Sequence, residues 1–394
     1  MSDAEILVVG GGIAGASTAF HLAAHGRQVT LLERGEIASG ASGVNAGAID
    51  SIGWGDTPDL QAHLTAGSVE IFTAVQLDHG QDIEFRQSGA LQAIHTPAQY
   101  AFAHQRVETL RKRGHQVELL TTREARSLEP GFSPALLGAM YSPLRSQADP
   151  QAATRALAAL AAQQGARVRT GHEVTAITAR GRDWVVRSPT GDIVAGALVI
   201  AAGAWCGPVG ALLGLDIPII PVRGQMWATA PAPTSVFQTI SSAESQHVWH
   251  LDPGGEPPCL TIRRGTRVTR HLYGRQRRNG EIIVGGDREL VGWNTMPDPA
   301  GIEVNRGHAA EVLPFLAGLP IARTWAGLMP FPLDGNPLIG RVPGRDGVWI
   351  VSGLASSGFG RGPMAGKLLA DYLHTGTAAP VLAGADPAGR IRER

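Results

Sequence analysis

Glycines near the N-terminus have the spacing of a loop that binds the diphosphate of a dinucleotide. Gly10, Gly12 and Gly15 match the pattern G-x-G-x-x-G. The first permits a tight turn, the second lets the backbone approach a pyrophosphate, and the third lets a helix pack closely on a strand. The first residues of that helix, Ile13 and Ala14, offer backbone N–H groups at the positive end of the helix dipole. These residues therefore predict binding of a dinucleotide cofactor.

An acidic residue follows at the distance that this motif needs. Glu33 stands 18 residues after Gly15, where its carboxylate can accept hydrogen bonds from ribose hydroxyls and would repel a 2′-phosphate. The alternative, a glycine-rich strand–helix turn beside a surface glutamate, explains less, because strand, helix and acid all occur in the required order. Arg34, next to Glu33, is assigned to the same site. The motif itself does not choose between FAD and NAD.

The elements that must position these residues form a β–α–β unit. Apolar residues predict a strand over 5–9, a helix over 13–25 that stops at Gly26, and a second strand over 28–33. The next segment, residues 36–55, is rich in Gly, Ala and Ser and predicts a long loop with one short helix.

A second helix is predicted in the middle of the chain. Asp149 and Pro150 are the residue types preferred at an N-cap and at the first helical position, so a helix is expected over 151–164. Two or three strands are expected between residues 168 and 186. The β-forming residues of 217–286 then predict an inserted antiparallel sheet.

Residues 193–215 carry no charge over 23 positions, which is long enough to span a bilayer. They also contain five glycines and Pro208. This pattern favours a buried parallel strand over 197–202, a turn, and a helix that begins at Pro208. We therefore expect no membrane span.

Composition excludes several classes of protein. The 394 residues include 34 acidic and 34 basic ones, so no basic surplus attracts nucleic acid or anionic lipid. Hydrophobic residues make up 43% of the chain and support a folded core. Two cysteines, Cys206 and Cys259, are too few for a disulfide framework or a zinc site, and no metal is expected. The N-terminus lacks the basic region of a secretory signal, so the cytoplasm is the expected compartment.

Six segments resemble, in the expected order, the FAD-dependent glycine oxidase / D-amino-acid oxidase superfamily. The similarity extends to the catalytic subunits of opine oxidases and hydrogen cyanide synthase. The segments are 38–47 (ASGASGVNAG), 198–205 (LVIAAGAW), 221–225 (PVRGQ), 279–286 (NGEIIVGG), 324–340 (TWAGLMPFPLDGNPLIG) and 353–366.

The resemblance implies an α/β plus β fold, with a discontinuous Rossmann-like FAD-binding domain and an inserted antiparallel-sheet substrate domain. The FAD-binding domain would comprise residues 1–84, 141–216 and 325–394, and the substrate-binding domain residues 85–140 and 217–324. Beyond the fingerprint, the resemblance assigns to FAD the residues Ser42, Asn45, Ala46, Gly47, Val174, Ala202, Gly203, Trp205, Gly327, Gly353, Ser356, Ser357, Gly358 and Phe359.

The implied reaction is oxidation of a C–N bond in an amino acid or secondary amine. Hydride transfer to flavin N5 would give an imine that water hydrolyses. The last flavin loop, 356–360, leads into a helix predicted over 363–373, whose N-terminal dipole could stabilise negative charge on reduced flavin. Some members of the superfamily hold flavin through a cysteine beside the W-A-G-L segment. Here Met329 and Pro330 stand at that place, so non-covalent FAD is expected.

The chain departs from the superfamily where glycine oxidase-type members hold the substrate carboxylate. Their two arginines correspond to Met329 and Ser356. Three explanations stay open: another arginine serves, the substrate is secondary or N-substituted with its carboxylate elsewhere, or the substrate is an amine without a carboxylate. The alternative arginines are Arg223, Arg263, Arg275 and Arg361. For each of them taken alone, a solvated surface charge is the commoner explanation.

The catalytic candidates are Tyr273, Arg223, Met329 and His250. Tyr273 resembles a substrate-facing tyrosine of glycine oxidase-type enzymes, although a tyrosine packed in a sheet is the plain alternative. His250 lies on an expected strand of the same domain, where a lone histidine is more often structural.

Three functions compete at this point. The first is an oxidase that uses oxygen. The second is the catalytic subunit of a heteromeric dehydrogenase that passes electrons to a partner subunit, and the third is an FAD-binding protein that has lost catalysis. A homo-oligomer and a heteromer with an electron-transfer subunit both stay open as assemblies.

Overall fold

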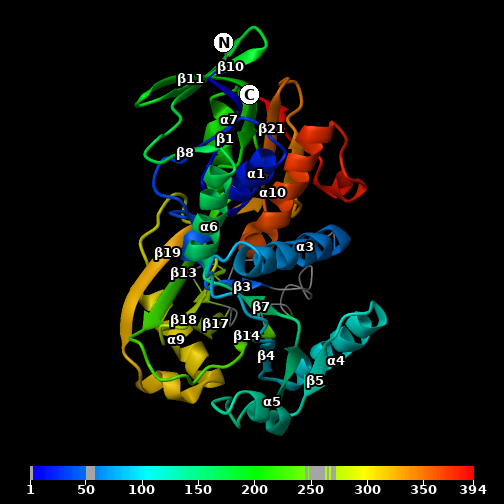
Figure 1. Cartoon of the computed structure of the whole chain (residues 1–394). Coiled ribbons are helices and arrows are strands. Elements are labelled where there is room, and N and C mark those ends of the chain that lie inside the picture. The colour runs from blue at the N-terminus through cyan, green and yellow to red at the C-terminus, as the bar shows by residue number, and fades with distance from the viewer. Residues whose placement is uncertain (1–2, 50–57, 245–246, 248–261, 264–265, 268–271) are drawn as a thin grey trace.

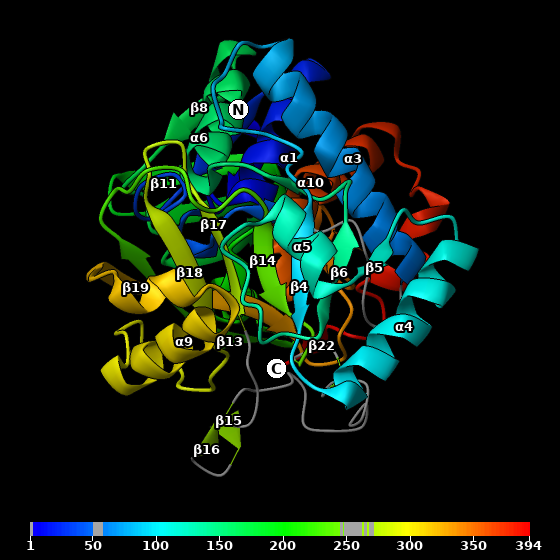
Figure 2. The same cartoon turned by 90° about the horizontal axis from the view of Figure 1, so that it is seen from below.

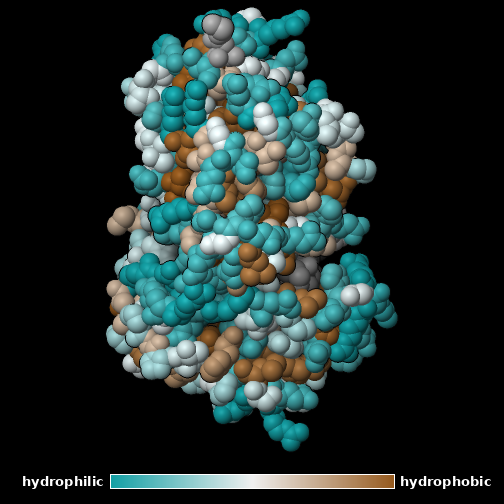
Figure 3. All heavy atoms as spheres, viewed as in Figure 1, coloured by the Kyte–Doolittle hydropathy of each residue, from teal (hydrophilic) through white to brown (hydrophobic). Residues whose placement is uncertain are grey.

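The computed structural model describes residues 3–49, 58–244, 247, 262–263, 266–267 and 272–394. Two eight-stranded sheets form its framework, one in the upper and one in the lower half of Figure 1. On the face drawn in Figure 3, hydrophobic side chains form small patches separated by hydrophilic ones. Among the helices of the described ranges, none combines the length and hydrophobicity that crossing a bilayer requires.

The first sheet is parallel at its centre. Strand β1 (Ala4–Val9) pairs in parallel with β2 (Val29–Leu32) on one side and β11 (Gly191–Ile200) on the other. Most of their residues are buried, apart from the exposed first two residues of β11, as expected for parallel strands covered on both faces. The remaining strands of this sheet are β8 (Arg167–Arg169), β9 (Ala176–Arg180), β10 (Asp183–Ser188), β20 (Leu338–Arg341) and β21 (Val348–Ser352).

Helices cover this sheet. Helix α1 (Ile13–Ala24) follows β1 and packs against α10 (Gly358–Thr375) and α6 (Pro150–Gln163), as Figure 1 shows. Helices α1 and α10 approach closely at Gly366, which has no side chain. A Cβ at this position would lie only 2.6 Å from the carbonyl oxygen of Ala14. Helix α3 (Pro58–Leu77) packs on the other side of α10.

The second sheet has the strand order β19-β13-β18-β17-β14-β4-β6-β5 and is antiparallel except between β14 and β4. Its core includes the fully buried Trp227, whose indole N–H donates to Asn305 of α9 at 2.8 Å. Figure 2 shows this sheet with α4, α5 and α9 around it. The strands are β4 (Ala90–Ile94), β5 (Glu118–Leu120), β6 (Gly138–Ser142), β13 (Ile219–Thr229), β14 (Thr239–Ser242), β17 (Leu272–Gln276), β18 (Ile282–Gly286) and β19 (Ile321–Pro332); the helices are α4 (Pro97–Lys112), α5 (Thr122–Leu128) and α9 (Pro299–Val312).

Short elements complete the described chain. The long loop after β2 contains the predicted short helix, α2, and also a short strand, β3, that pairs with β7. These and the other short elements are α2 (Ala41–Val44), β3 (Ala48–Ile49), β7 (Ser146–Gln147), η1 (Gly203–Trp205), α7 (Cys206–Ala211), β12 (Leu215–Asp216), β15 (Ile262–Arg263), β16 (Thr266–Arg267), η2 (Pro314–Gly318), η3 (Ala355–Ser357), η4 (Pro380–Ala385) and β22 (Arg392–Glu393).

The local predictions are mostly confirmed. Helix α1 ends one residue before the expected position, and the Asp149 carboxylate caps α6 by accepting from the N–H of Ala152 at 2.8 Å. Residues 191–200 form the buried strand β11 rather than a membrane helix. The antiparallel sheet is confirmed for the described strands between 217 and 286, and it also recruits residues 90–142 and β19.

Two predicted helix starts are wrong, both at prolines. Helix α7 begins at Cys206, ahead of Pro208, and α10 begins at Gly358, with Pro363 inside it. A proline is tolerated in the first turn of a helix, where its missing N–H would have no intrahelical partner. Inside α10, Pro363 removes one intrahelical donor, and its carbonyl accepts a hydrogen bond from Ser17 of α1 at 2.6 Å, which ties the two helices together.

Candidate active site

A cavity of about 620 Å³ lies where the carboxyl ends of β1, β2 and β11 meet the second sheet. This volume is within the range of small-molecule binding sites. The first sheet contributes the fingerprint residues and the loops that follow its strands. The second sheet contributes Gly224, Met226, Tyr273 and Met329. One cavity therefore joins the predicted dinucleotide site to the predicted substrate side.

The fingerprint glycines have distinct geometric roles. Gly10 has φ +118°, and a Cβ on it would lie 2.4 Å from the carbonyl oxygen of Ala201. A Cβ on Gly15 would lie 2.0 Å from the carbonyl oxygen of Gly10. Gly12 lines the cavity as the N-cap of α1 and has no side-chain capping bond. The N-terminus of α1 is thus held against the strand and open toward the cavity.

Glu33 is fixed in the cavity wall by backbone donors. Its Oε2 accepts from the N–H of Gly11 at 2.7 Å, and its Oε1 accepts from the N–H of Gly35 at 2.8 Å. An ionised carboxylate has about four acceptor positions, so capacity remains for ribose hydroxyls. Beside it, the guanidinium of Arg34 lies 3.9 Å from the ring centroid of Trp205, and both line the cavity.

The loop 38–47 is held in place from several sides. Ser42 lines the cavity and its hydroxyl accepts from the N–H of Ile13 at 2.9 Å. The indole N–H of Trp325, on β19, donates to the carbonyl of Val44 at 2.8 Å. Asn45, which also lines the cavity, accepts from the N–H of Gly47 at 2.8 Å. This loop is therefore shaped by both sheets.

Two predicted residues of that loop lie behind the cavity wall. The carbonyl of Ala46 accepts a hydrogen bond from Nε of the fully buried Arg275. Gly47 has φ +82°, and a Cβ there would lie 1.9 Å from the carbonyl oxygen of Ala148. Both residues set the path of the loop and neither is among its lining residues.

The loop before α10 forms another part of the wall. Ser356, Gly358 and Phe359 line the cavity, whereas Gly353 and Ser357 do not. Gly353 has φ +76° and packs against Pro337. Because α10 begins at Gly358, its N-terminal amide groups and the positive end of its dipole face the cavity. The remaining predicted residues that line it are Val174, Ala202, Gly203 and Gly327.

The substrate-side wall is apolar. Tyr273 donates its hydroxyl hydrogen to Sδ of Met226 at 3.3 Å. Burial raises the pKa of the Tyr273 phenol to about 12, although the charge of Arg288 opposes that rise. The phenol is therefore neutral at physiological pH. Met329 lines the same wall.

Of the alternative arginines, Arg223, Arg275 and Arg361 are not among the described residues that line the cavity. Arg223 donates from Nε to Glu289 at 3.0 Å and from Nη1 to the carbonyl of Met296 at 2.7 Å. Its charge is thus neutralised by an acid in the same buried pair. Arg361 is buried beside Thr65 of α3. His250 and the side chain of Arg263 lie outside the described residues.

Arg288 is a further residue near the cavity, and the sequence patterns did not predict it. It follows β18 and is 4% exposed, and its Nη2 donates to the hydroxyl of Ser356 at 2.8 Å. Its only sequence signal is its place just after a buried strand of the substrate-side sheet. Arg288 is not itself among the described lining residues; those that line the cavity without having been predicted include Ser39, Ala41, Val44, His172, Glu173, Met226 and Thr295.

These residues fit FAD. Gly12 leaves room for a diphosphate at the start of α1, Glu33 suits the ribose, and the cavity continues to both sheets. Cys206 is fully buried, and burial raises the pKa of its thiol to about 12, so it is unsuited to a covalent flavin bond. Cys259 lies outside the described residues. The described part of the chain contains no group of His, Cys, Asp or Glu side chains able to hold a metal ion.

Comparison with known proteins agrees with this geometry. The chain is 31% identical to glycine oxidase of Pseudomonas aeruginosa, over 98% of this chain and 99% of that protein. It is 27% identical to hydrogen cyanide synthase subunit HcnC of the same species, over 96% of this chain and 95% of that protein. The crystal structure of glycine oxidase from Geobacillus kaustophilus superimposes with a TM-score of 0.85 at 25% identity, covering 98% of each chain.

The family model described as FAD-dependent oxidoreductase matches residues 5–372. That span includes the fingerprint, both sheets and the loop before α10, and the match confirms the predicted resemblance and cofactor. The chain belongs to the family of FAD-dependent oxidoreductases.

Proposed function

We propose that this enzyme oxidises a C–N bond in a small amino acid or secondary amine. The observation that carries the proposal is the single cavity shared by the fingerprint and by Tyr273 and Met329. A dinucleotide bound at the fingerprint would extend toward that substrate-side wall. The similarity to glycine oxidases along nearly the whole chain supports the same class of substrate.

The chain's own residues would hold FAD at several points. The N-terminus of α1 would bind the diphosphate, and Glu33 would bind the ribose. The loop 38–47 and Gly327 would contact the flavin end of the cofactor. When bound, FAD accepts a hydride from the carbon that carries the nitrogen, and water hydrolyses the resulting imine. The N-terminus of α10 would stabilise negative charge at the flavin end.

The substrate-side wall favours a neutral amine. Among the described lining residues, the second sheet contributes Met226, Met329 and a protonated Tyr273, with no carboxylate. Removal from water disfavours the charged ammonium form. A neutral amine has a free electron pair on nitrogen, so oxidation at the adjacent carbon needs no side-chain base.

The test is an anaerobic screen for flavin bleaching with the purified FAD-loaded enzyme. The panel contains glycine, sarcosine, D-amino acids, proline derivatives and opines. We expect loss of the visible flavin absorption with at least one of them. If none bleaches the flavin while dithionite does, the proposal fails, and an FAD-binding protein without catalysis becomes the better description.

The electron acceptor is a second question. The similarity to a subunit of hydrogen cyanide synthase favours transfer to a partner subunit as the alternative to oxygen. Turnover of the best substrate in air, with peroxide measured directly, separates the two. Stoichiometric peroxide from the isolated chain supports an oxidase. Turnover only with an added dye acceptor supports the heteromeric dehydrogenase.

A further inference from the structure

The substrate-side end of the cavity has little fixed charge. Among the described residues that line the whole cavity, those that can carry a charge are Glu33, Arg34, His172 and Glu173. All four belong to loops of the first sheet. Positions 329 and 356 carry an apolar and a hydroxyl side chain. A carboxylate on the substrate would need a cation close to this end, because an unpaired buried charge is costly.

The segment after β18 places Arg288 beside this end. Arg223 and Glu289 exchange two backbone hydrogen bonds, of 2.9 and 3.1 Å. The side chain of Asp287 accepts from Nε2 of Gln225 at 3.0 Å. Both neighbours of Arg288 are thus tied to β13, on either side of Gly224, which lines the cavity. These contacts fix the backbone from which Arg288 extends.

The guanidinium of Arg288 reaches the cavity wall. Its Nη2 lies 2.8 Å from the hydroxyl oxygen of Ser356, which is an exposed lining residue. Its Cζ lies 5.6 Å from the ring centroid of Phe331 on β19. The positive charge also acts on Tyr273, which lines the same wall. The guanidinium of Arg288 is therefore linked to the cavity wall through its hydrogen bond to Ser356.

Two other buried arginines, both on strands of the second sheet, have partners away from this wall. Arg223 is paired with Glu289. Arg275 contacts the carbonyl of Ala46 and lies 3.6 Å from Glu84. Neither charge is directed to a lining residue of the substrate-side wall, whereas that of Arg288 is.

We propose that Arg288 and Ser356 form the subsite for a carboxylate of the substrate, which rests on the proposed amine oxidation. Arg288 acts as a positioning residue: its N–H occupies the serine oxygen, which leaves the hydroxyl hydrogen to be donated to the carboxylate. The buried guanidinium supplies the compensating charge. Charge-assisted hydrogen bonds of this kind are the stronger ones in proteins.

The test uses binding, so that it does not depend on turnover. Benzoate and its neutral counterpart benzamide are titrated into the FAD-loaded enzyme, and the shift of the flavin spectrum gives each Kd. In Arg288→Met we expect the benzoate Kd to rise about tenfold or more, with the benzamide Kd unchanged. Ser356→Ala changes a surface-accessible hydroxyl and should weaken benzoate selectively as well.

Two further variants sharpen the result. Arg288→Lys keeps the charge and should recover part of the benzoate affinity lost in Arg288→Met. Arg187→Met, an exposed arginine on β10 paired with Asp192, is the matched control and should bind benzoate as the wild type does. If Arg288→Met does not retain FAD, Arg288→Lys and Ser356→Ala decide the outcome, since wild-type selectivity in both would refute the subsite.

The two proposals fail in different ways. Wild-type benzoate affinity in the folded, FAD-loaded Arg288→Met enzyme overturns this inference, as does a wild-type enzyme that does not prefer benzoate to benzamide. Absence of flavin bleaching by every amine overturns only the proposed reaction, because the benzoate titration is read without it.

Discussion

Gly12 and Gly15 stand three residues apart, yet a methyl group has different consequences at each. At Gly15 a Cβ would meet the carbonyl oxygen of Gly10 at 2.0 Å, and backbone cannot move aside cheaply. At Gly12 it would meet only the hydroxyl of Ser42, at 3.1 Å, on the cavity side. The structure therefore separates a glycine needed for packing from one needed for cofactor approach.

Gly12→Ala should accordingly fold but bind FAD poorly. The added methyl group would occupy space that the diphosphate needs, so we expect FAD affinity to fall about tenfold, with the stability of the apoprotein changed by less than about 0.5 kcal/mol. Gly15→Ala should instead destabilise the apoprotein by about 1–3 kcal/mol. FAD titration and urea unfolding measure the two quantities.

Gly307→Ala is a matched control for both variants. Gly307 lies within α9, and a Cβ there would meet no atom within 4 Å. Alanine is the better helix former, so stability should rise by about 0.5–1 kcal/mol with FAD affinity unchanged. Wild-type FAD affinity in Gly12→Ala would refute the diphosphate site.

His21, on α1, makes stability depend on pH. Burial lowers its pKa from 6.5 to about 4, and its Nε2 has no hydrogen-bond partner within the described structure. Below pH 6.5 the unfolded chain binds a proton that the native protein does not. The free energy of unfolding should therefore decrease as pH falls from about 7 to 4.

His21→Leu should lose less stability than the wild type between pH 7.5 and pH 5, by about 2 kcal/mol. Urea unfolding at the two pH values measures this. His104→Leu removes an exposed histidine and should keep the wild-type pH dependence. Equal losses in His21→Leu and the wild type would contradict the assigned pKa direction.

The cysteines bear on how flavin is held. The fully buried Cys206 has a thiol pKa raised to about 12 by burial, so little reactive thiolate forms at neutral pH. We expect acid denaturation and filtration to release the yellow colour from the protein. Colour retained on the precipitated chain would show a covalent bond and contradict this prediction.

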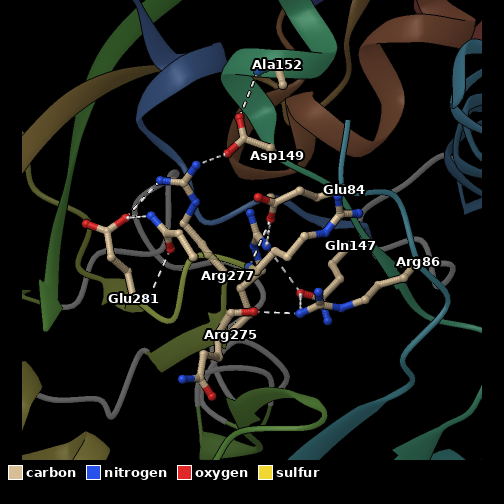
Figure 4. A network of polar contacts seen from close by, with 12 residues as sticks. Glu84, Arg86, Gln147, Asp149, Ala152, Arg275, Arg277 and Glu281 are labelled. Atoms are coloured by element: carbon tan, nitrogen blue, oxygen red, sulfur yellow. Dashed lines mark hydrogen bonds and ion pairs between the residues drawn. The ribbon is translucent and has the colours of Figure 1, made fainter. Parts of the chain in front are cut away.

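At the scale of elements, Arg275 on β17 and Arg277 just after it join the two sheets through the segments around the loop 38–47. Figure 4 shows Arg275 and Arg277 between Asp149, Gln147 and Glu84. Arg277 bonds to Asp149, the N-cap of α6, at 2.5 Å, and Arg275 to the carbonyl of Ala46. Burial lowers the pKa of Arg275 to about 10, but it stays charged at neutral pH.

Arg275→Met should loosen this junction. The change leaves the carbonyl of Ala46 without its donor and Glu84 without its cation, so we expect a loss of about 3 kcal/mol in stability. FAD affinity should fall too, because the loop 38–47 loses a support. The exposed Arg187→Met serves as control, and an Arg275→Met protein of wild-type stability and FAD affinity would contradict the assignment.

At the scale of the whole molecule, the cavity lies between the two sheets, so a full-length cofactor should link them. FAD at 100 times its Kd should stabilise the native state by about 2.7 kcal/mol. ADP would fill only the end of the cavity at the first sheet.

Hydrogen–deuterium exchange separates these effects. FAD should slow exchange in α1, in the loop 38–47 and in β13, whereas ADP should slow it mainly in α1 and β2. Equal protection of β13 by the two nucleotides would contradict a cofactor site that reaches the second sheet.

Short-range patterns in the sequence determined the fingerprint, the ends of α1, the cap of α6 and the buried strand β11. Each depends on neighbouring residues, since glycine spacing, capping side chains and apolar runs act within one or two turns of chain. The same patterns misplaced the starts of α7 and α10, because the tolerance of a helix for proline depends on what packs around it.

Only the tertiary structure decided which charges face the substrate. Arg223 meets Glu289 across 66 residues of sequence, and Arg288 meets Ser356 across 68. Nothing local distinguishes these arginines, because each is a cation within or just after a β-strand of the same sheet. The bridge between Arg223 and Glu289, just after β18, brings the first pair together and places Arg288 beside the cavity wall. Pairing between distant segments cannot be deduced from neighbouring residues.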